Sequence, residues 1–297
     1  MKILLLGCGG QVGWELQRSL APLGELIALD RDTQPLACDF SQPASLEALV
    51  QAVQPDLIVN SAAHTAVDKA ESEPDLVRAI NAEAPAVLAR AAAQRGAWLV
   101  HYSTDYVFDG AGNHARVEDA PTGPLSVYGR TKLEAEQAIA ASGCKHLIFR
   151  TSWVYAARGG NFAKTMLKLA AERGQLTVID DQVGAPTGAE LLADVTALAL
   201  RTGLQRPEVS GLYHLVAGGE TTWCQYARHV VAWAQAHGYT LKAGPEQIMP
   251  VPTSSYPTPA QRPLNSRLDT HKLQTAFGLT LPHWQAGVDR MLAEHLG

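Results

Sequence analysis

Tyr128 and Lys132 form the one pair in the chain in which a lysine follows a tyrosine four residues later. In a helix that we expect to begin at Pro124, this spacing places both side chains on the inward stripe with Ala135 and Ile139. A buried ammonium needs partners, and its charge favours the phenolate of a neighbouring tyrosine. We therefore predict a Tyr128 pKa below the usual value of about 10, suited to a general acid or base. The alternative is a packed tyrosine beside a lysine that reaches solvent.

The chain begins with the pattern of a dinucleotide-binding turn. An apolar run over Lys2 to Leu6 predicts a strand, and a helix is predicted over Trp14 to Leu20. Glycines between a strand and a helix let the backbone approach a pyrophosphate, while the helix N-terminus supplies N–H donors. Their spacing here is looser than the usual G-x-G-x-x-G, so a simple tight turn is the alternative. The residues expected at the phosphates are Gly7, Gly10, Gln11, Val12 and Gly13.

An acidic residue stands where a dinucleotide site would place one. A second predicted strand, Glu25 to Leu29, ends at Asp30, and in such sites an acid about 20 residues beyond the glycines binds the ribose hydroxyls. Asp30 favours NAD because a carboxylate repels a 2′-phosphate, whereas Arg31 would pair with that phosphate. Both NADH and NADPH therefore remain candidates. A third strand is predicted over Leu36 to Cys38. The residues expected beside the adenine are Asp39 and Phe40.

Two further strand ends border the crevice in which open α/β sheets bind their ligands. These strands are predicted over Asp56 to Asn60 and Ala97 to Tyr102, and between them lies a predicted helix, Pro74 to Arg95, with Asn81 directed inward. A lone histidine after a strand is more typical of a loop, and hydroxyls at a strand end either bind a substrate oxygen or form an ST-turn. The expected ligand-facing residues are Ala63, His64, Thr65 and Tyr102 for the cofactor, and Thr104 and Asp105 for the substrate.

The order of these features resembles the extended short-chain dehydrogenase/reductase family. The shared features are a glycine turn, an acid on the second strand, Ser103-Thr104 on a later strand and Tyr128-x-x-x-Lys132 on the next helix. The resemblance implies an α/β fold with a Rossmann-type doubly wound parallel sheet and a smaller, mixed α/β C-terminal substrate domain. It also implies that Thr104, Tyr128 and Lys132 surround the nicotinamide of NADPH or NADH. In that arrangement Tyr128 supplies the proton, Lys132 holds the nicotinamide ribose, and Thr104 holds the carbonyl oxygen.

The second half of the chain is expected to form the substrate domain. We place a dinucleotide-binding domain over residues 1–150 and a substrate domain over 151–297, with 174–181 and 211–237 returning to the first domain. Strands are predicted over 145–150, 176–179 and 211–216, and helices over 161–173, from 187 to 200 and over 223–237. The proline-rich segment 245–263 is expected to be irregular and to form a pocket wall.

Later motifs give a closer match within this family. They are residues 103–110, 150–155, 181–187 and 262–266, and as a set they resemble the members that reduce sugars carried on dTDP. The implied reaction passes a hydride to the C4 ketone of dTDP-4-dehydro-L-rhamnose, giving dTDP-L-rhamnose. Trp153 is either a packing residue or a cover for a sugar ring. Arg262 and Arg267, with the Asn265 amide between them, either bind a diphosphate or belong to a solvated loop. The expected substrate-binding residues are Thr104, Asp105, Tyr128, Trp153, Arg262 and Asn265.

Three other functions are compatible with parts of this pattern. A dehydratase of the family needs a further acid and base after the threonine, and here Tyr106 follows Asp105 in place of a glutamate. An epimerase needs little beyond the tyrosine and lysine, but it regenerates its cofactor and so consumes none. A non-catalytic regulatory subunit would have no need for Thr104, Tyr128 and Lys132 together. Simple reduction is therefore the favoured function.

Composition limits the remaining possibilities. The net charge is -5 and the pI about 6.1, which argues against a nucleic-acid binder that acts through general basicity. No run approaches the ~18 apolar residues of a membrane span, and the N-terminus does not read as a secretory signal, so we expect a cytoplasmic protein. The four cysteines lie far apart and indicate neither disulfides nor zinc. The sequence does not fix the oligomeric state or a need for metal. The family resemblance makes a homodimer one candidate, with Mg²⁺ at the dimer contact in some members. The acids available for it are Glu15, Glu190, Asp289 and Glu294, and no metal ligand is assigned.

Overall fold

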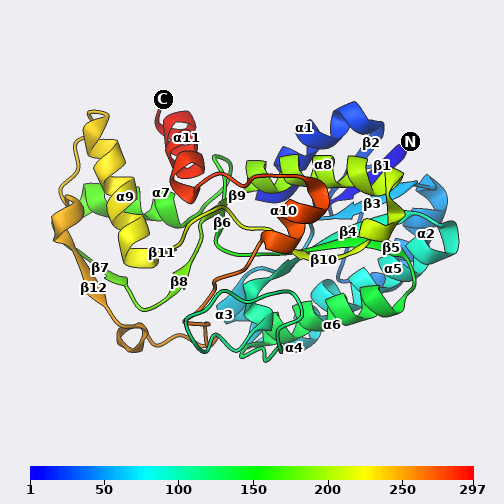
Figure 1. Ribbon diagram of the computed structural model, residues 1–297, viewed down its shortest axis with the longest axis horizontal. Helices are drawn as coiled ribbons and strands as arrows, with labels where there is room; N and C mark the ends of the chain where they lie inside the picture. The colour runs from blue at the N-terminus through cyan, green and yellow to red at the C-terminus, as the bar shows by residue number, and fades with distance from the viewer.

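A six-stranded parallel sheet with the order β10-β5-β4-β3-β1-β2 forms the centre of the molecule (Figure 1). The computed structural model describes all residues from 1 to 297. Most residues in the four central strands are buried, as expected for a parallel sheet covered on both faces. The strands are β1 (Lys2–Leu6), β2 (Glu25–Leu29), β3 (Leu57–Asn60), β4 (Trp98–Thr104), β5 (Lys145–Thr151) and β10 (Gly211–His214).

Helices cover both faces of this sheet, so the predicted doubly wound α/β fold is confirmed. One face packs against α1 (Gln11–Leu20), α8 (Ala189–Gln205) and α10 (His271–Phe277) in a single hydrophobic core. The other face packs against α2 (Pro43–Val53) and α5 (Ala84–Arg95), with α6 (Val127–Ala141) beside them. Figure 1 shows α1 and α8 on one side of the strands and α5 and α6 on the other.

Several predicted elements differ in detail from the observed ones. The predicted strand over 36–38 does not form, and those residues are irregular. The long helix predicted over 74–95 is three segments, α4 (Pro74–Arg78), a π-helical turn (Ala79–Glu83) and α5. A π-helical turn often marks a functional position, and this one contains the buried Asn81. The helix predicted from Pro124 begins at Val127, because the Ser126 hydroxyl accepts a hydrogen bond from the Gly129 amide and caps it.

The second half of the chain adds short two-stranded sheets and three helices at one end of the molecule (Figure 1). Of the segment 211–237, only β10 joins the central sheet, because α9 (Trp223–Ala236) packs against α7 (Phe162–Glu172). The segment 174–181 does not return to that sheet either, because β7 pairs with β12. β12 lies inside the proline-rich segment predicted to be irregular, and α10 and α11 were not predicted. The elements are β6 (Val154–Tyr155), β7 (Leu176–Ile179), β8 (Val183–Gly184), β9 (Thr187–Gly188), β11 (Thr221–Thr222), β12 (Ile248–Val251), α7 (Phe162–Glu172), α9 (Trp223–Ala236) and α11 (Trp284–Leu296).

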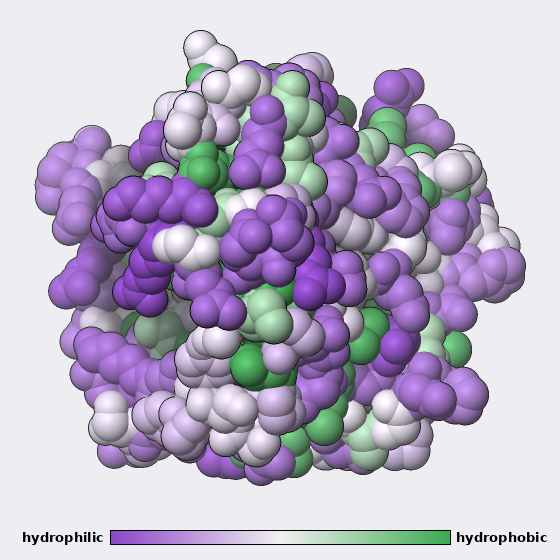
Figure 2. All heavy atoms as spheres, turned by 90° about the vertical axis from the view of Figure 1, so that its left-hand side faces the viewer, coloured by the Kyte–Doolittle hydropathy of each residue, from purple (hydrophilic) through white to green (hydrophobic).

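Shorter helical turns complete the chain. None of the helices combines the length and the apolar character that crossing a membrane would require. The end of the molecule that carries α9 is mostly hydrophilic, with hydrophobic residues scattered rather than gathered in one patch (Figure 2). The short elements are α3 (Val67–Ala70) and the 3₁₀ turns Ala21–Leu23, Asp105–Val107, Pro207–Val209, Pro245–Gln247 and Thr253–Ser255.

Candidate functional site

The turn between β1 and α1 brings backbone very close to backbone. Gly7 has a φ of 84°, and a Cβ there would lie 2.6 Å from the Ala62 nitrogen. A Cβ at Gly13 would lie 2.0 Å from the Gly7 carbonyl oxygen, so α1 sits directly on the turn. Gly10 caps α1 without a side-chain hydrogen bond, which leaves N–H donors free at a positive helix end. Such a helix end binds phosphate.

Asp30 is tied to this turn. One carboxylate oxygen accepts a hydrogen bond from the Gly9 amide (2.9 Å) and the other from the Arg31 amide (2.8 Å). Gly9, which sequence reasoning did not single out, has no room for a Cβ, since it would lie 2.4 Å from the Asp30 carboxylate. The exposed Arg31 side chain lies 3.8 Å from Asp39. Hydrogen bonds from Ser41, and then the Arg31 charge, hold the pKa of Asp39 below its usual value.

A cavity of about 470 Å³ opens between this turn and the second half of the chain. Three of its buried side-chain oxygens have no hydrogen-bond partner, namely Gln11 Oε1, Asp105 Oδ2 and Thr151 Oγ1. Unpartnered buried oxygens are costly, so the cavity suits a ligand with hydrogen-bond donors. Its lining includes Gly10, Gln11, Val12, Ala63, Thr65, Tyr102, Thr104, Asp105, Tyr128, Lys132 and Trp153.

Two residues expected at the cofactor lie elsewhere. The His64 side chain does not line the cavity and lies 3.8 Å from Glu73, while its backbone exchanges two hydrogen bonds with Asn81. The buried, inward Asn81 thus fixes the loop that carries Ala63 and Thr65. Phe40 is only 6% exposed and belongs to the hydrophobic core under the sheet, so packing rather than ligand contact explains it.

The surroundings of Tyr128 favour its phenol over its phenolate. Burial first, and then the charge of Asp105, raise its pKa to about 12, while the neighbouring Thr104 side chain acts in the opposite direction. The prediction of a lowered Tyr128 pKa is therefore wrong for the chain without ligands. The physical reason is that Lys132 directs its amine elsewhere, to the Tyr102 carbonyl at 2.5 Å and the His101 ring at 3.1 Å.

A buried ion pair fixes the helix that carries Tyr128 and Lys132. Glu136, two turns after Tyr128, pairs with Arg150 of β5 at 2.7 Å and accepts a hydrogen bond from Ser103 of β4 at 2.5 Å. Burial lowers the pKa of Lys132 to about 8, and the Glu136 charge opposes that shift. The pair thus ties α6 to two strands, and the Glu136 carboxylate favours the charged form of the buried lysine.

Thr104 and Asp105 form a polar pair at the end of β4. The Thr104 hydroxyl donates to Asp105 Oδ1 at 3.0 Å and accepts from the Tyr106 amide at 3.2 Å. Burial raises the pKa of Asp105 to about 6, and the neighbouring hydroxyl groups of Ser266 and Thr104 oppose that shift. Its free Oδ2 points to a ligand hydroxyl as the missing donor.

Trp153 closes one side of the cavity. Its φ is 50°, a left-handed conformation that is strained for a bulky residue and that often marks functional sites. Its ring stacks on that of Trp223 with the centroids 3.6 Å apart. Gly184 supports the stack, because a Cβ there would lie 2.8 Å from the Trp153 ring. Trp223 is distant in sequence and belongs to no motif, so sequence reasoning missed it.

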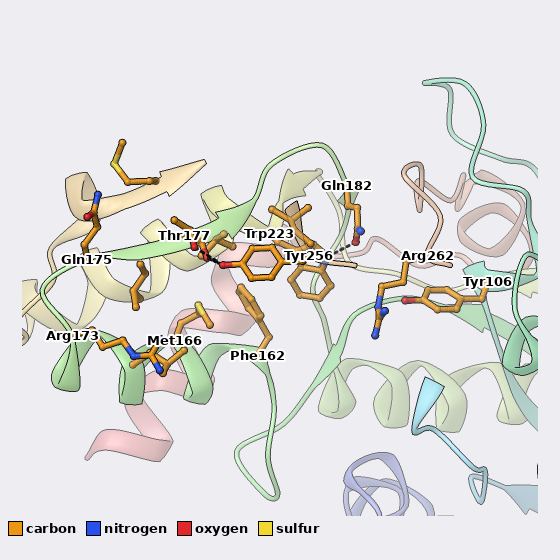
Figure 3. Close-up of a pocket in the computed structure, with 15 residues that line it drawn as sticks. Tyr106, Phe162, Met166, Arg173, Gln175, Thr177, Gln182, Trp223, Tyr256 and Arg262 are labelled. Atoms are coloured by element: carbon orange, nitrogen blue, oxygen red, sulfur yellow. Dashed lines mark hydrogen bonds between the residues drawn. The ribbon is translucent and has the colours of Figure 1, made fainter. Parts of the chain in front are cut away.

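A second cavity, of about 670 Å³, shares Tyr106 and Trp223 with the first (Figure 3). Its lining is mostly hydrophobic, and Tyr256 reaches across it to hydrogen-bond the backbone carbonyl of Thr177 at 3.0 Å. Arg262 lies at the end next to Tyr106 and pairs with Asp68 at 2.7 Å. The other lining residues include Phe162, Met166, Leu169, Arg173, Gln182 and Met249.

Comparisons with known proteins agree with this geometry. The sequence model of the RmlD substrate binding domain matches residues 1–296. The dTDP-4-dehydrorhamnose reductase of Salmonella typhimurium is 60% identical over 294 residues, covering 99% of this chain and 98% of the relative. The chain belongs to the dTDP-4-dehydrorhamnose reductase family. The family's Escherichia coli K12 member is 58% identical over the same length, with the same coverage of both chains.

Solved structures in this family share the whole fold. The reductase of Clostridium acetobutylicum superposes with a TM-score of 0.87 at 34% identity, and 99% of each chain is covered. The reductase of Bacillus anthracis, solved in complex with NADP, gives the same TM-score at 32% identity and the same coverage. The chain is thus an oxidoreductase of a family in which a nicotinamide dinucleotide is bound, as the glycine turn predicted.

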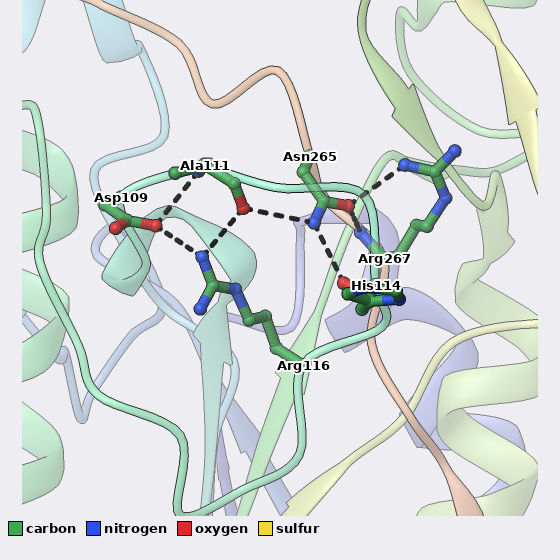
Figure 4. Close-up of polar contacts among 6 residues, drawn as sticks. All are labelled: Asp109, Ala111, His114, Arg116, Asn265 and Arg267. Carbon is green, nitrogen blue, oxygen red and sulfur yellow. Dashed lines mark hydrogen bonds and ion pairs between the residues drawn. The ribbon is translucent and has the colours of Figure 1, made fainter.

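Asn265 does not line either cavity in this family member. Its side chain is buried and donates to the His114 carbonyl at 2.9 Å, and it accepts hydrogen bonds from Arg267 (Figure 4). Next to it, Arg116 contacts Asp109 at 2.6 Å within the loop after β4. The expected substrate contact is therefore replaced by a structural role, because the amide ties segment 262–267 to this loop.

The acids considered for a metal do not converge in one chain. No group of three His, Cys, Asp or Glu side chains is arranged to hold a metal ion. Glu15, Glu190 and Glu294 line one surface cavity, but Arg18 lies 3.5 Å from Glu15 and Arg290 lies 3.8 Å from Glu190. Asp289 is directed away to His229 at 2.6 Å. Mg²⁺ prefers several oxygen ligands in octahedral geometry. The carboxylates of one chain do not converge in this way, because arginine and histidine side chains hold them.

Proposed function

We propose that this chain reduces the C4 ketone of dTDP-4-dehydro-L-rhamnose to dTDP-L-rhamnose with NADPH or NADH. The observation that carries the proposal is that Thr104, Tyr128 and Lys132 line one cavity with the N-terminus of α1. A helix end suited to a pyrophosphate therefore lies beside a buried phenol that can protonate an alkoxide. The full-length identity of 60% to a dTDP-4-dehydrorhamnose reductase supports the substrate.

Each residue of the cavity receives a role from its chemistry. Tyr128 donates its proton to the developing alkoxide, and its raised pKa keeps the phenol protonated at working pH. Thr104 holds the ketone oxygen, and the free oxygen of Asp105 accepts a sugar hydroxyl. Lys132 holds the nicotinamide ribose and contributes positive charge as the alkoxide forms. A bound nicotinamide supplies the hydride, while these side chains orient, protonate and exclude water.

The dinucleotide is held at the turn between β1 and α1. Gly10, Gln11 and Val12 face its phosphates, Asp30 and Arg31 lie at the adenosine ribose, and Asp39 lies at the adenine side. The Arg31 side chain is largely exposed, and its contact with Asp39 is long, at 3.8 Å. Its guanidinium is therefore free to turn toward a 2′-phosphate. We therefore propose that both NADPH and NADH are accepted.

The second cavity is proposed to hold the dTDP group. Its aromatic residues Trp223, Phe162 and Tyr256 offer surfaces for the thymine ring, and Arg262 offers a guanidinium for the diphosphate. Trp153, which lines the first cavity and stacks on Trp223, covers the sugar. We propose residues 1–150 as the dinucleotide half and residues from 151–297 as the nucleotide-sugar half, with α8, β10 and α10 returning from the second half to the central sheet.

A direct assay tests the proposed reaction. The purified chain is mixed with dTDP-4-dehydro-L-rhamnose and either NADPH or NADH, and absorbance at the nicotinamide band is followed. We expect loss of one reduced cofactor for each sugar reduced. An epimerase would convert the sugar with no net loss of the cofactor, and a regulatory subunit would leave both unchanged. Either outcome would contradict the proposal.

A homodimer remains part of the proposal. The face formed by α1, α8 and α11 presents Glu15, Glu190 and Glu294 with Arg18 and Arg290, so a second copy could bring further carboxylates to it. Sedimentation of the purified chain, with and without Mg²⁺, tests this contact. Because one chain does not supply a metal site, no step of the proposed reaction involves Mg²⁺.

A further inference from the structure

Lys132 ends on a buried imidazole that the proposed reaction does not use. The Lys132 amine lies 3.1 Å from Nε2 of His101 and 2.5 Å from the Tyr102 carbonyl oxygen. His101 and Tyr102 both belong to β4. His101 is 1% exposed and Lys132 is 2% exposed. A buried imidazole in direct contact with a buried amine must share hydrogens with it in a defined way.

Asn60, at the end of β3, fixes the tautomer of that imidazole. Asn60 Oδ1 accepts a hydrogen bond from the Ala62 amide at 3.0 Å, so its NH₂ group faces Nδ1 of His101 at 3.1 Å. An NH₂ group only donates, and therefore Nδ1 accepts. The neutral ring then carries its hydrogen on Nε2, directed at the Lys132 amine.

An Nε2–H donor suits the amine of Lys132 better than the ammonium. The neutral amine donates to the Tyr102 carbonyl, accepts from His101 Nε2–H and keeps one N–H for the cavity. The ammonium has no lone pair, so its hydrogens would face the ring N–H. His101 thus stabilises Lys132 after it has lost a proton.

We propose that His101 is a positioning residue for Lys132, and that it stabilises the amine that remains when Lys132 passes a proton to Tyr128. The inference rests on the proposed function. Each reduction leaves Tyr128 as a phenolate, which must regain a proton before the next turnover. Because the Lys132 amine is directed to Tyr102 and His101, the proton would cross the cavity that Lys132 and Tyr128 share through an intervening hydroxyl group or water. An N–H bond of the ammonium breaks and its electron pair stays on nitrogen, while the intervening hydroxyl takes that proton and gives its own to the phenolate. Solvent then returns one proton to the amine.

The surrounding charges are compatible with this exchange. Glu136, also on α6, favours the ammonium, but Arg150 of β5 neutralises much of its effect. On the cavity side, the titratable residues that line the same cavity as Lys132 are Tyr102, Asp105, Tyr106 and Tyr128. Burial lowers the pKa of Lys132 to about 8, within reach of working pH. Burial and the Lys132 charge also hold the pKa of His101 well below its ordinary value, so the ring stays neutral.

The tautomer is tested in the complete chain without ligands. Nitrogen-15 NMR distinguishes protonated from bare imidazole nitrogens, and His101→Gln identifies the His101 signals among those of the 10 histidines. We expect hydrogen on Nε2 and a bare Nδ1. In Asn60→Asp, the new carboxylate accepts from Nδ1–H, so the hydrogen should move to Nδ1. A native ring with its hydrogen on Nδ1 would overturn the inference.

The kinetic role is tested by the pH dependence of kcat with saturating substrate and cofactor. In His101→Leu the Lys132 amine loses its N–H donor, so the basic limb should move upward by about one pH unit, equivalent to a tenfold change in the amine-to-ammonium ratio. His101→Gln keeps an amide N–H in place of the ring N–H and should move the limb less. At neutral pH, kcat should fall while KM stays close to the native value. His146→Gln removes a half-buried imidazole at the far end of β5 and serves as the matched control, with an unmoved limb.

The outcomes separate the two proposals. If His101→Leu loses thermal stability but keeps the native pH profile, His101 is structural and the inference fails. If the native chain oxidises no NADPH or NADH with the sugar nucleotide, the proposed function fails, whereas the NMR result still decides the tautomer.

Discussion

Tyr128 must carry its proton when the ketone is reduced, because the alkoxide takes that proton. The structure provides this through burial rather than through the lysine, since burial and Asp105 raise the Tyr128 pKa to about 12. Tyr128→Phe keeps the ring and its edge-on contact with Tyr106 but removes the acid. We expect kcat to fall by about 10²–10⁴-fold, with cofactor and sugar-nucleotide affinities close to native. Stopped-flow turnover and calorimetric binding measure both, and native turnover in this variant would remove Tyr128 from the mechanism.

The buried carboxylate of Asp105 is expected to lower the stability of the folded chain while it contributes to sugar-nucleotide binding. Its pKa is raised from 3.8 to about 6, so the folded chain binds more protons than the unfolded chain between these values, and stability contributed by this group falls as pH rises through that window. Above pH 6 the full cost is on the order of 3 kcal/mol. Asp105→Asn should therefore melt higher than the native chain at pH 7.5 and show little difference at pH 4. Its KM for the sugar nucleotide should rise. Equal melting differences at both pH values would contradict this account.

At the scale of elements, the contact between α1 and the turn before it decides whether a dinucleotide can be held. Gly13→Ala would place a methyl group 2.0 Å from the Gly7 carbonyl and 2.8 Å from Ser61 Oγ, forcing the helix off the turn. Overpacking of this kind costs about 1–3 kcal/mol, and about 1.4 kcal/mol equals tenfold in affinity. We expect roughly tenfold weaker NADPH binding by fluorescence titration. Gly160→Ala, where a Cβ meets nothing within 4 Å, is the control and should bind normally.

Helices and strands with regular apolar patterns were predictable, and so was their order. The strands of the central sheet appear within a few residues of their predicted positions, because parallel strands buried on both faces are short apolar runs. The strand predicted over 36–38 is absent. The start of α6 was misplaced because the pattern shows Pro124, whereas the cap is a hydrogen bond of Ser126. The π-helical turn at 79–83 leaves the apolar pattern unbroken, so no periodicity reveals it.

At the scale of the whole molecule, the sequence predicted the dinucleotide side better than the substrate side. Glycines, Asp30 and Tyr128 are identifiable because backbone geometry or chemistry demands those residue types. The walls of the second cavity, such as Met166 and Met249, are ordinary apolar positions of α7 and β12. They become a pocket only because β7 pairs with β12 instead of joining the central sheet, and no local pattern encodes that pairing.

Asn265 joins the two halves of the molecule, so its replacement tests how they are held together. Asn265→Ala removes hydrogen bonds to the His114 carbonyl and from Arg267, and should cost about 1–3 kcal/mol in unfolding free energy. Asn265→Asp keeps the acceptor for Arg267 but sets a carboxylate against the His114 carbonyl. At pH 8 this charge should make the aspartate variant less stable than the alanine variant. Near pH 4.5 a protonated carboxyl can donate to that carbonyl, so the order should reverse. Urea unfolding at both pH values measures it, and an aspartate variant as stable as the native chain at pH 8 would show that this amide does not hold the loop.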